Sequence, residues 1–246
     1  DYRIVTADTG VMGGLLSEEF QAVTDIGEDI LVLCDCGYAS NIEVSECVNN
    51  KEKAEKPKVR ELVHTPNAKT IEEVSNLLEE DKDKFVKTLI YKIDDTLYAC
   101  LVSGDREINE TKLLKLIGGT KIELASFEEV EKVTNAKVGF AGPIDLDIKI
   151  VIDNDILYKY NYIVGANKTD YHYKNVNTSD FKYDYIGDIK NVKEFDACPK
   201  CGKKLYFKNG IEIGNTFKLG TKYSKALDLN YLDENNTLKP VVMGCY

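Results

Sequence analysis

Three stretches of the chain carry apolar side chains at the spacing of one helix face. Within residues 71–78 the apolar positions recur three and four residues apart, and Thr70 opens a capping-box pattern ahead of them. Ser126 opens the same pattern before a second amphipathic stretch. A third helical pattern covers residues 109–117 and ends at two glycines, which favour the left-handed conformation of a helix end. We therefore expect three short helices at these places.

Between these helices the pattern becomes typical of β-strands. Residues 85–93 and 97–103 are separated by two aspartates, which predicts a hairpin. Both faces of residues 85–93 are largely apolar, so this strand should be covered on both sides. Residues 148–152 and 158–164 predict two further strands. Together these helices and strands predict a compact α+β domain with strands of mixed direction.

The segments that flank this domain have a different pattern. Residues 29–33 are an apolar run typical of a short buried strand, and residues 204–207 alternate like a strand. Residues 49–57 have no apolar periodicity and end in a proline, which is typical of a linker. The chain shows no internal repeat. We divide it into an N-terminal segment, residues 1–48, a central domain, residues 49–194, and a return segment, residues 195–246.

The composition narrows the class of protein. Apolar residues make up 43% of the chain and charged residues 30%, which is ordinary for a globular protein. No apolar run approaches the roughly 20 residues of a membrane-spanning helix. The net charge of −10 comes mostly from the first 50 residues, where ten acidic side chains face Arg3 alone. The chain therefore lacks a basic nucleic-acid footprint, and any contact with nucleic acid must be local. Because it has no initiator methionine, we interpret the chain as an excised fragment.

The seven cysteines include a possible metal site. Cys198 and Cys201 have the spacing of a zinc half-site, because a tight turn points both thiolates at one ion. Their best partners are Cys34 and Cys36, which lie one residue closer together. We predict a structural zinc ion held by these four residues. The alternative is four free thiols at the base of a hairpin.

Five strings of residues occur in an order that resembles bacterial-type prolyl-tRNA synthetases, and the resemblance covers nearly the whole chain. The strings are TADTGVMGG at residues 6–14, VKTLI at 86–90, VGFAGP at 138–143, VGAN to NVN at 164–177, and GIEIG to MGCY at 210–246. The resemblance implies a mixed-sheet editing domain, similar to aminoacyl-tRNA deacylases, inserted into part of a class II synthetase antiparallel-sheet core.

The resemblance also implies an activity. In that family the inserted domain hydrolyses the ester of tRNA(Pro) wrongly charged with alanine, so the expected partner is the charged 3′ end of that tRNA. The intact enzyme would be a proline–tRNA ligase that uses ATP and Mg²⁺, and we expect a cytoplasmic homodimer with no membrane partner. Most of the arginine motifs for ATP and the anticodon-binding domain are absent, so we do not expect this fragment to aminoacylate tRNA.

Positions in these strings imply the residues of the site. Lys87 would contact the terminal phosphates of the tRNA, although a lysine in a strand can also bury its stem and extend its amine into solvent. Gly139, Gly142 and Pro143 form a loop whose backbone N–H groups would hold the ester carbonyl and the ribose. The alternative for this loop is an ordinary surface turn.

The same resemblance assigns His172 to the amino-acid pocket. Asp153 would orient the amino group of the substrate or a water, although residues 153–155 equally predict a turn. Only two histidines are present and neither lies near a nucleophile motif, so we expect a positioned water and no acyl-enzyme. Lys87, the glycine-proline loop and His172 should then enclose one small cavity.

The resemblance is incomplete at two positions. Glu18 and Asn215 stand where the family usually has histidines near the proline pocket. Three functions therefore remain open: an editing esterase, a ligase remnant that binds proline, and a zinc-stabilised module that binds tRNA or serves a structural role without editing. An assay of Ala-tRNA(Pro) deacylation separates the first from the third, and a proline-binding measurement tests the second.

Overall fold

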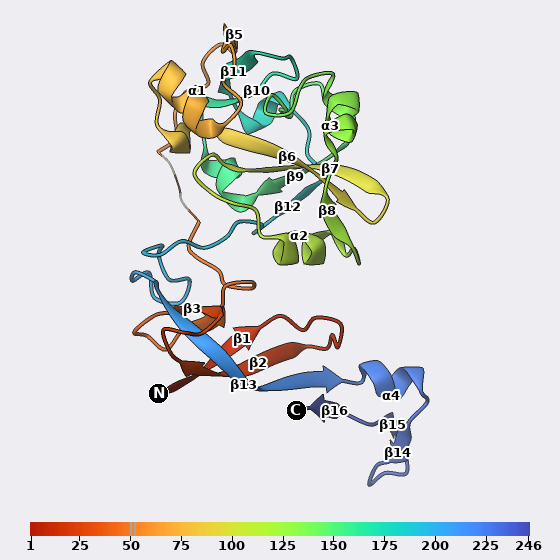
Figure 1. Cartoon of the computed structure of the whole chain (residues 1–246). Coiled ribbons are helices and arrows are strands. Elements are labelled where there is room, and N and C mark those ends of the chain that lie inside the picture. The colour runs from red at the N-terminus through yellow and green to blue at the C-terminus, as the bar shows by residue number, and fades with distance from the viewer. Residues whose placement is uncertain (50, 52) are drawn as a thin grey trace. The chain divides into compact units, whose positions relative to one another are not determined.

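The structure is a computed structural model that describes residues 1–49, 51 and 53–246. It divides into two compact units. Unit 1 consists of Asp1–Val48 together with Val192–Tyr246, and unit 2 consists of Asn49–Asn191. Each unit has its own sheets (Figure 1). Each unit also has its own buried apolar clusters.

Unit 2 is built on a five-stranded sheet of mixed direction. The strand order is β12-β9-β7-β6-β8, with β6 (Val86–Ile93), β7 (Thr96–Ser103), β8 (Ile122–Leu124), β9 (Lys149–Asp153) and β12 (Tyr185–Gly187). The hairpin of β6 and β7 and the pairing of β6 with β8 are antiparallel, whereas β9 runs parallel to both β7 and β12. The predicted α+β domain with a mixed sheet is therefore confirmed.

A second, three-stranded sheet in unit 2 was only partly predicted. It contains β10 (Tyr162–Gly165), β11 (Tyr171–Val176) and β5 (Glu61–His64), all antiparallel. The prediction of a strand over residues 158–164 is wrong at its start, because the 3₁₀ helix η2 (Asn154–Tyr158) occupies this region. Asp153 caps η2 by accepting a hydrogen bond from the Asp155 N–H, which ends β9 and delays the next strand.

The three predicted helices are confirmed as α1 (Ile71–Leu78), α2 (Glu110–Ile117) and α3 (Phe127–Thr134). Thr70 and Ser126 each make the complete capping box that the sequence predicted. The α2 helix ends at Gly118, which has a positive φ of 77°. Short 3₁₀ turns complete the unit at Lys82–Lys84 (η1) and Thr178–Asp180 (η3).

The five-stranded sheet separates two apolar clusters. On one face Val86 and Ile90 pack with Val130 of α3 and with strands of the three-stranded sheet. On the other face Tyr91 and its neighbours pack against Leu113 of α2. Both faces of β6 are thus covered, as the sequence predicted, and the helices lie on opposite sides of the sheet (Figure 1).

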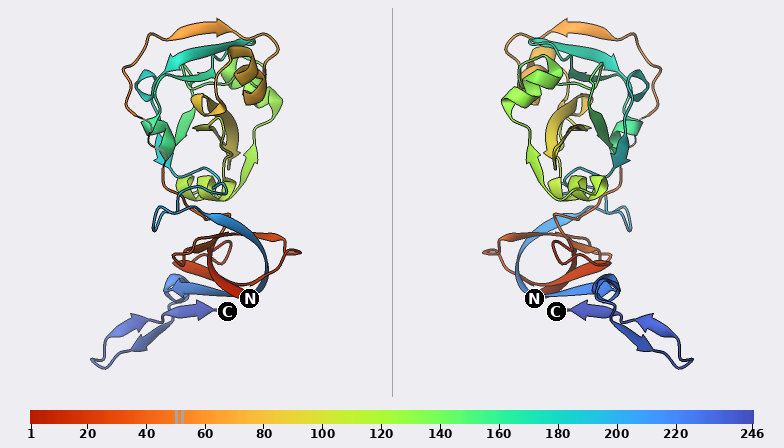
Figure 2. Two further views of the ribbon diagram at one scale, coloured as in Figure 1. Left: turned by 90° about the vertical axis from the view of Figure 1, so that its left-hand side faces the viewer. Right: turned by 90° about the vertical axis from the view of Figure 1, so that its right-hand side faces the viewer.

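Unit 1 contains a six-stranded sheet that closes on itself. The long strand β13 pairs with β2 through residues 210–218 and with β3 through residues 206–210, both antiparallel, and the result is the ring of strands seen in Figure 2. The strands are β1 (Tyr2–Ala7), β2 (Leu16–Val23), β3 (Asp29–Leu33), β4 (Ala39–Asn41), β13 (Tyr206–Gly220) and β16 (Met243–Cys245). A short helix α4 (Lys222–Ala226) and the hairpin of β14 (Asn230–Leu232) and β15 (Leu238–Pro240) follow β13.

Candidate functional site

Unit 2 contains a cavity of about 640 Å³ beside strand β6. Strand β8 pairs with β6 only at Tyr91–Ile93. At the other end, Phe85, the residue before β6, forms a single bridge with Ile163 of β10. Among the described residues, the outer edge of residues 86–90 therefore has no paired strand. The cavity lies along this open edge, and the start of α1 together with Val138, Gly139 and Ala141 also lines it.

Lys87 lines this cavity from β6. The Lys87 side chain is 15% exposed, and its Nζ donates to Oε1 of Glu107 at 2.6 Å. The Glu107 side chain is 71% exposed, so the ion pair lies at the boundary with solvent and contributes little to stability. The Lys87 amine is thus held at the cavity by a partner that solvent or an anionic ligand can replace.

The glycine-proline loop packs against β10 because its glycines allow a close approach. A Cβ on Gly142 would clash with the carbonyl oxygen of Gly165. Gly139 has a φ of +102°, and a Cβ there would lie 2.7 Å from the Lys69 backbone oxygen. Gly139 lines the cavity, whereas Gly142 and the adjacent Pro143 are buried and are not among the described residues of its lining.

Asn167 fixes the path of this loop. Its Oδ1 accepts a hydrogen bond from the Gly142 N–H at 2.8 Å, and its Nδ2 donates to the carbonyl oxygens of Gly142 and Ile144. The Gly142 N–H therefore already has a hydrogen-bond acceptor inside the domain. The N–H groups of Gly139 and Ala141, which both line the cavity, have no acceptor among the described residues. Sequence reasoning gave Asn167 no role, although its position in the VGAN string was a usable signal.

His172 lies on β11 and lines the cavity with a ring that is almost fully buried. Its Nδ1 shares a 2.7 Å hydrogen bond with Oγ1 of Thr65, and its ring meets that of Phe140 edge-on with centroids 5.7 Å apart. Burial lowers the pKa of His172 to about 4, so the imidazole is neutral at physiological pH. Thr65 is fully buried and fixes the ring, a role that sequence reasoning missed because Pro66 follows it in an apparent loop.

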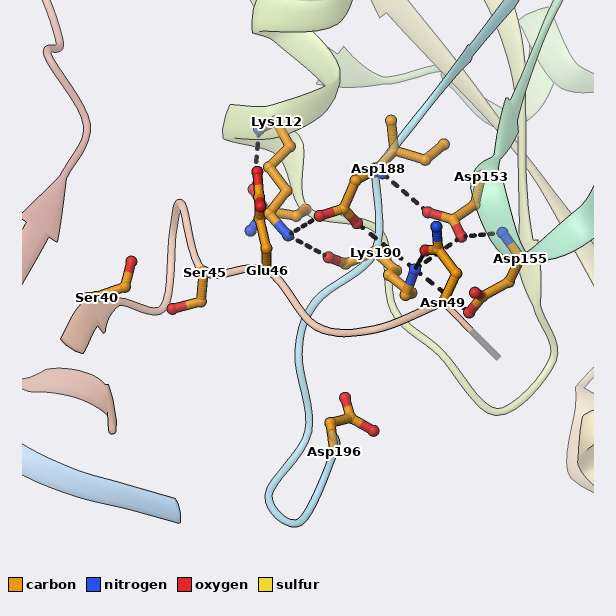
Figure 3. Close-up of polar contacts among 12 residues, drawn as sticks. Ser40, Ser45, Glu46, Asn49, Lys112, Asp153, Asp155, Asp188, Lys190 and Asp196 are labelled. Atoms are coloured by element: carbon orange, nitrogen blue, oxygen red, sulfur yellow. Dashed lines mark hydrogen bonds and ion pairs between the residues drawn. The ribbon is translucent and has the colours of Figure 1, made fainter. Parts of the chain in front are cut away.

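The structure places Asp153 away from the cavity, whose described lining does not include it. Its carboxylate is fully buried at the end of β9 and accepts three hydrogen bonds. The donors are the N–H of Asp155 at 2.9 Å, the N–H of Ile189 at 2.9 Å and Nζ of Lys190 at 3.2 Å (Figure 3). The carboxylate therefore has its own partners inside the domain, and its role in orienting the substrate stays a prediction from the sequence.

Asp153 belongs to a cluster that we call the Lys190 network, formed by Lys190, Asp153, Asp155, Asp188 and Lys112 (Figure 3). Lys190 is 1% exposed, and its Nζ lies within 3.7 Å of a carboxylate oxygen of each of the three aspartates. Lys112 of α2 pairs with Asp188 at 2.9 Å. Lys190 Nζ also donates to Oδ1 of Asn49, which ties the first residue of unit 2 to its last residue but one.

The four cysteines predicted to bind metal meet in unit 1. Cys34 and Cys36 follow β3, and Cys198 and Cys201 precede β13; their sulfurs all lie within 4.8 Å of one another. The closest pairs are Cys34 with Cys201 at 3.5 Å and Cys36 with Cys198 at 3.7 Å. All seven cysteines are free thiols. A tetrahedral site with Zn–S bonds of about 2.3 Å separates its sulfurs by about 3.8 Å, so the four thiols fit a zinc ion.

Comparisons with known proteins give the context for these sites. Residues 65–183 match a family model described as an aminoacyl-tRNA editing domain. The whole chain is 54% identical to the proline–tRNA ligase of Thermoanaerobacter sp. (strain X514) and 52% identical to that of Caldicellulosiruptor bescii, and it spans 44% of the length of each. A solved structure of a candidate trans-editing enzyme for prolyl tRNA synthetase matches 54% of this chain and 87% of its own, with a TM-score of 0.47 and 20% identity. Within the described residues, no helix is both long and apolar enough to cross a bilayer.

Proposed function

We propose that this chain, which belongs to the prolyl-tRNA synthetase family and carries its aminoacyl-tRNA editing domain, hydrolyses the ester that links alanine to tRNA(Pro). The observation that carries the proposal is the single cavity lined by Lys87, Gly139 and His172. These residues come from β6, from the loop before β9 and from β11, so only the folded domain brings them together.

The chemistry of the cavity suits the end of a tRNA that carries a small amino acid. Its volume lies in the range of sites for ligands of this size. Part of the lining is apolar, with Phe85, Ile163 and Val164, and His172 beside it is neutral. A methyl side chain can therefore enter without leaving a buried charge unpaired. Lys87 supplies one positive charge at the cavity, where the terminal phosphate would bind.

In the proposed reaction the chain positions a water and stabilises the developing charge. The water oxygen attacks the ester carbonyl carbon, the C–O bond to the ribose breaks, and the ribose oxygen leaves with a proton from the water. The neighbouring ribose hydroxyl assists this proton transfer. The N–H groups of Gly139 and Ala141 are available to the carbonyl oxygen as its negative charge develops. His172 shapes the pocket and is not the general acid, because its pKa of about 4 leaves it unprotonated at neutral pH.

The relatives are about twice as long as this chain, so the activity of a complete synthetase is also a proposal. We propose that unit 1 is part of a class II catalytic core that, in a longer homodimeric cytoplasmic protein, uses ATP and Mg²⁺ to attach proline to tRNA. This chain by itself should neither aminoacylate tRNA nor bind proline detectably.

We further propose that the four cysteines of unit 1 hold a structural zinc ion. Four thiolates would satisfy its tetrahedral coordination, and the ion would join the turn after β3 to the turn before β13. A backbone hydrogen bond closes each turn: the N–H of Gly37 bonds to the Cys34 carbonyl, three residues earlier, at 3.0 Å, and that of Gly202 to the Cys198 carbonyl, four residues earlier, at 2.8 Å. In both turns the glycine directly follows the second cysteine.

The deciding experiment compares tRNA(Pro) charged with alanine and with proline. Incubation with the chain should release alanine while proline stays attached, as measured by loss of the labelled amino acid from the tRNA. Release of neither amino acid would favour the alternative of a non-editing module. Equal release of both would mean that the cavity does not select for side-chain size, and the proposed substrate would be wrong.

A further inference from the structure

Thr88 is a buried polar residue of the cavity whose hydroxyl has no hydrogen-bond partner among the described residues. The residue is 9% exposed and lies between Val86 and Ile90 on the face of β6 that packs into an apolar cluster. Valine has nearly the same shape and favours strands equally well. A buried, unpaired hydroxyl costs about 1–3 kcal/mol, so the fold alone gives no reason to have one here.

The backbone of Thr88 also faces the cavity side of β6. In the β6–β7 hairpin, Ile93 and Thr96 flank a two-residue loop and exchange backbone hydrogen bonds. Every second residue of β6 before Ile93 (Tyr91, Leu89 and Lys87) is therefore also bonded through its backbone to β7. Thr88 and Ile90 lie between these positions, and their N–H and C=O groups point away from β7. The Ile90 carbonyl shows this direction, because it accepts from the Ala125 N–H at 3.0 Å. At Thr88 no described strand continues the pairing.

Thr88 therefore offers two hydrogen-bond acceptors, its hydroxyl and its carbonyl, at one point of the cavity. We propose that Thr88 binds the α-amino group of the aminoacyl ester through these two oxygens. The inference rests on the proposed editing function. The acidic side chains of the lining already have partners: Glu107 pairs with Lys87, Glu72 with Lys82, and Asp105 accepts a hydrogen bond from Ser103 at 2.6 Å. Asp153 belongs to the Lys190 network and is not among the described residues of the lining.

The test measures binding, so that it does not depend on hydrolysis. tRNA(Pro) is prepared with alanine joined to its end through a stable amide, and a second probe carries lactate, which has a hydroxyl in place of the amino group. Thr88→Val should weaken binding of the alanyl probe about 10-fold or more, the loss expected for a hydrogen bond to a charged group. Binding of the lactyl probe should weaken several-fold less, because its neutral hydroxyl donates a weaker hydrogen bond than an ammonium group.

Two further variants serve as controls. Thr88→Ser keeps the hydroxyl and should bind the alanyl probe nearly as the unmodified chain does. Thr96→Val removes an exposed threonine hydroxyl at the start of β7 and should affect neither probe. Because Thr88→Val removes an unpaired hydroxyl, its melting temperature should rise by about 2–4 °C, which excludes misfolding as the cause of weaker binding.

The inference is overturned if Thr88→Val weakens both probes equally or neither, or if the unmodified chain does not prefer the alanyl probe. Failure of the proposed function gives a different result. In that case the unmodified chain leaves the ester of Ala-tRNA(Pro) intact, whatever the pattern of binding to the amide probes.

Discussion

The cavity and the Lys190 network lie in the same unit, and they differ in how their polar side chains are paired. In the network every charged side chain has an opposite charge within 4 Å, although Lys190 and Asp153 are almost completely buried. At the cavity, Lys87 has a partner that is mostly in solvent, and the hydroxyl of Thr88 has no partner among the described residues. The charges of the network are paired inside the domain, although Oδ1 of Asp188 accepts no hydrogen bond among the described residues. The unpartnered hydroxyl beside the cavity remains available to a ligand.

The largest expected effect comes from breaking the Lys190 network. Lys190→Met leaves Asp153 and Asp155 buried without their cation, and we expect a loss of about 3–5 kcal/mol in the free energy of unfolding. Chemical denaturation measures it. The matched control is Lys115→Met on the exposed face of α2, which should change stability by less than about 0.5 kcal/mol. A loss below about 1 kcal/mol for Lys190→Met would contradict a structural role for the network.

In unit 1, the four clustered cysteines allow a test of whether a bound zinc ion stabilises the fold. With Zn²⁺ at about 100 times its dissociation constant, binding should stabilise the fold by about 2.7 kcal/mol. Native mass spectrometry should show one zinc per chain, and a chelator or Cys198→Ser should remove both the metal and the stabilisation. Deacylation by unit 2 should continue without the metal. A metal-free protein with unchanged stability would favour the alternative of four free thiols.

At the cavity, function should change more than stability. Lys87→Ala should lower kcat/KM for Ala-tRNA(Pro) by about 10- to 100-fold, or about 1.4–2.8 kcal/mol, because the phosphate contact is lost. Its stability should change by less than about 1 kcal/mol, since Glu107 is exposed. Lys92→Ala is the matched control: Lys92 lies on the same strand and also pairs with a glutamate, Glu129 at 3.1 Å, but does not line the cavity. An equal loss of kcat/KM in both variants would contradict a specific contact between Lys87 and the tRNA phosphate.

The smallest expected effect concerns the pH dependence of stability. The pKa of His172 is lowered to about 4 in the folded chain, so the unfolded chain binds this proton at higher pH. The stabilisation that comes from keeping His172 neutral is therefore fully present above pH 7, and it is lost as the pH falls towards 4. Between pH 7 and 5.5 the unfolding free energy should fall by about 1 kcal/mol more than in His172→Gln. Parallel pH profiles for the two proteins would mean that the ring is not desolvated.

Much of the local structure of unit 2 was predictable because its causes lie within a few residues. The capping boxes at Thr70 and Ser126 join groups three residues apart, and the β6–β7 hairpin depends on the two aspartates between its strands. Strands β5 and β11 were not predicted, because their pattern is set by pairing across more than a hundred residues of chain. The 3₁₀ helix η2 was missed in the same region, since Asp153 both ends β9 and caps the turn.

The candidate site likewise has features that the sequence predicts and features that only the structure shows. Sequence alone drew attention to Lys87, the glycine-proline loop, His172 and the two cysteine pairs, because glycine spacing, cysteine spacing and the family strings are properties of neighbouring residues. It could not show that Asp153 meets Lys190, that Thr65 holds His172, or that the Thr88 hydroxyl is left without a partner. In each case, polar groups from segments far apart in the sequence are buried side by side. Only the tertiary structure decides which of these charges and hydroxyls have hydrogen-bond partners.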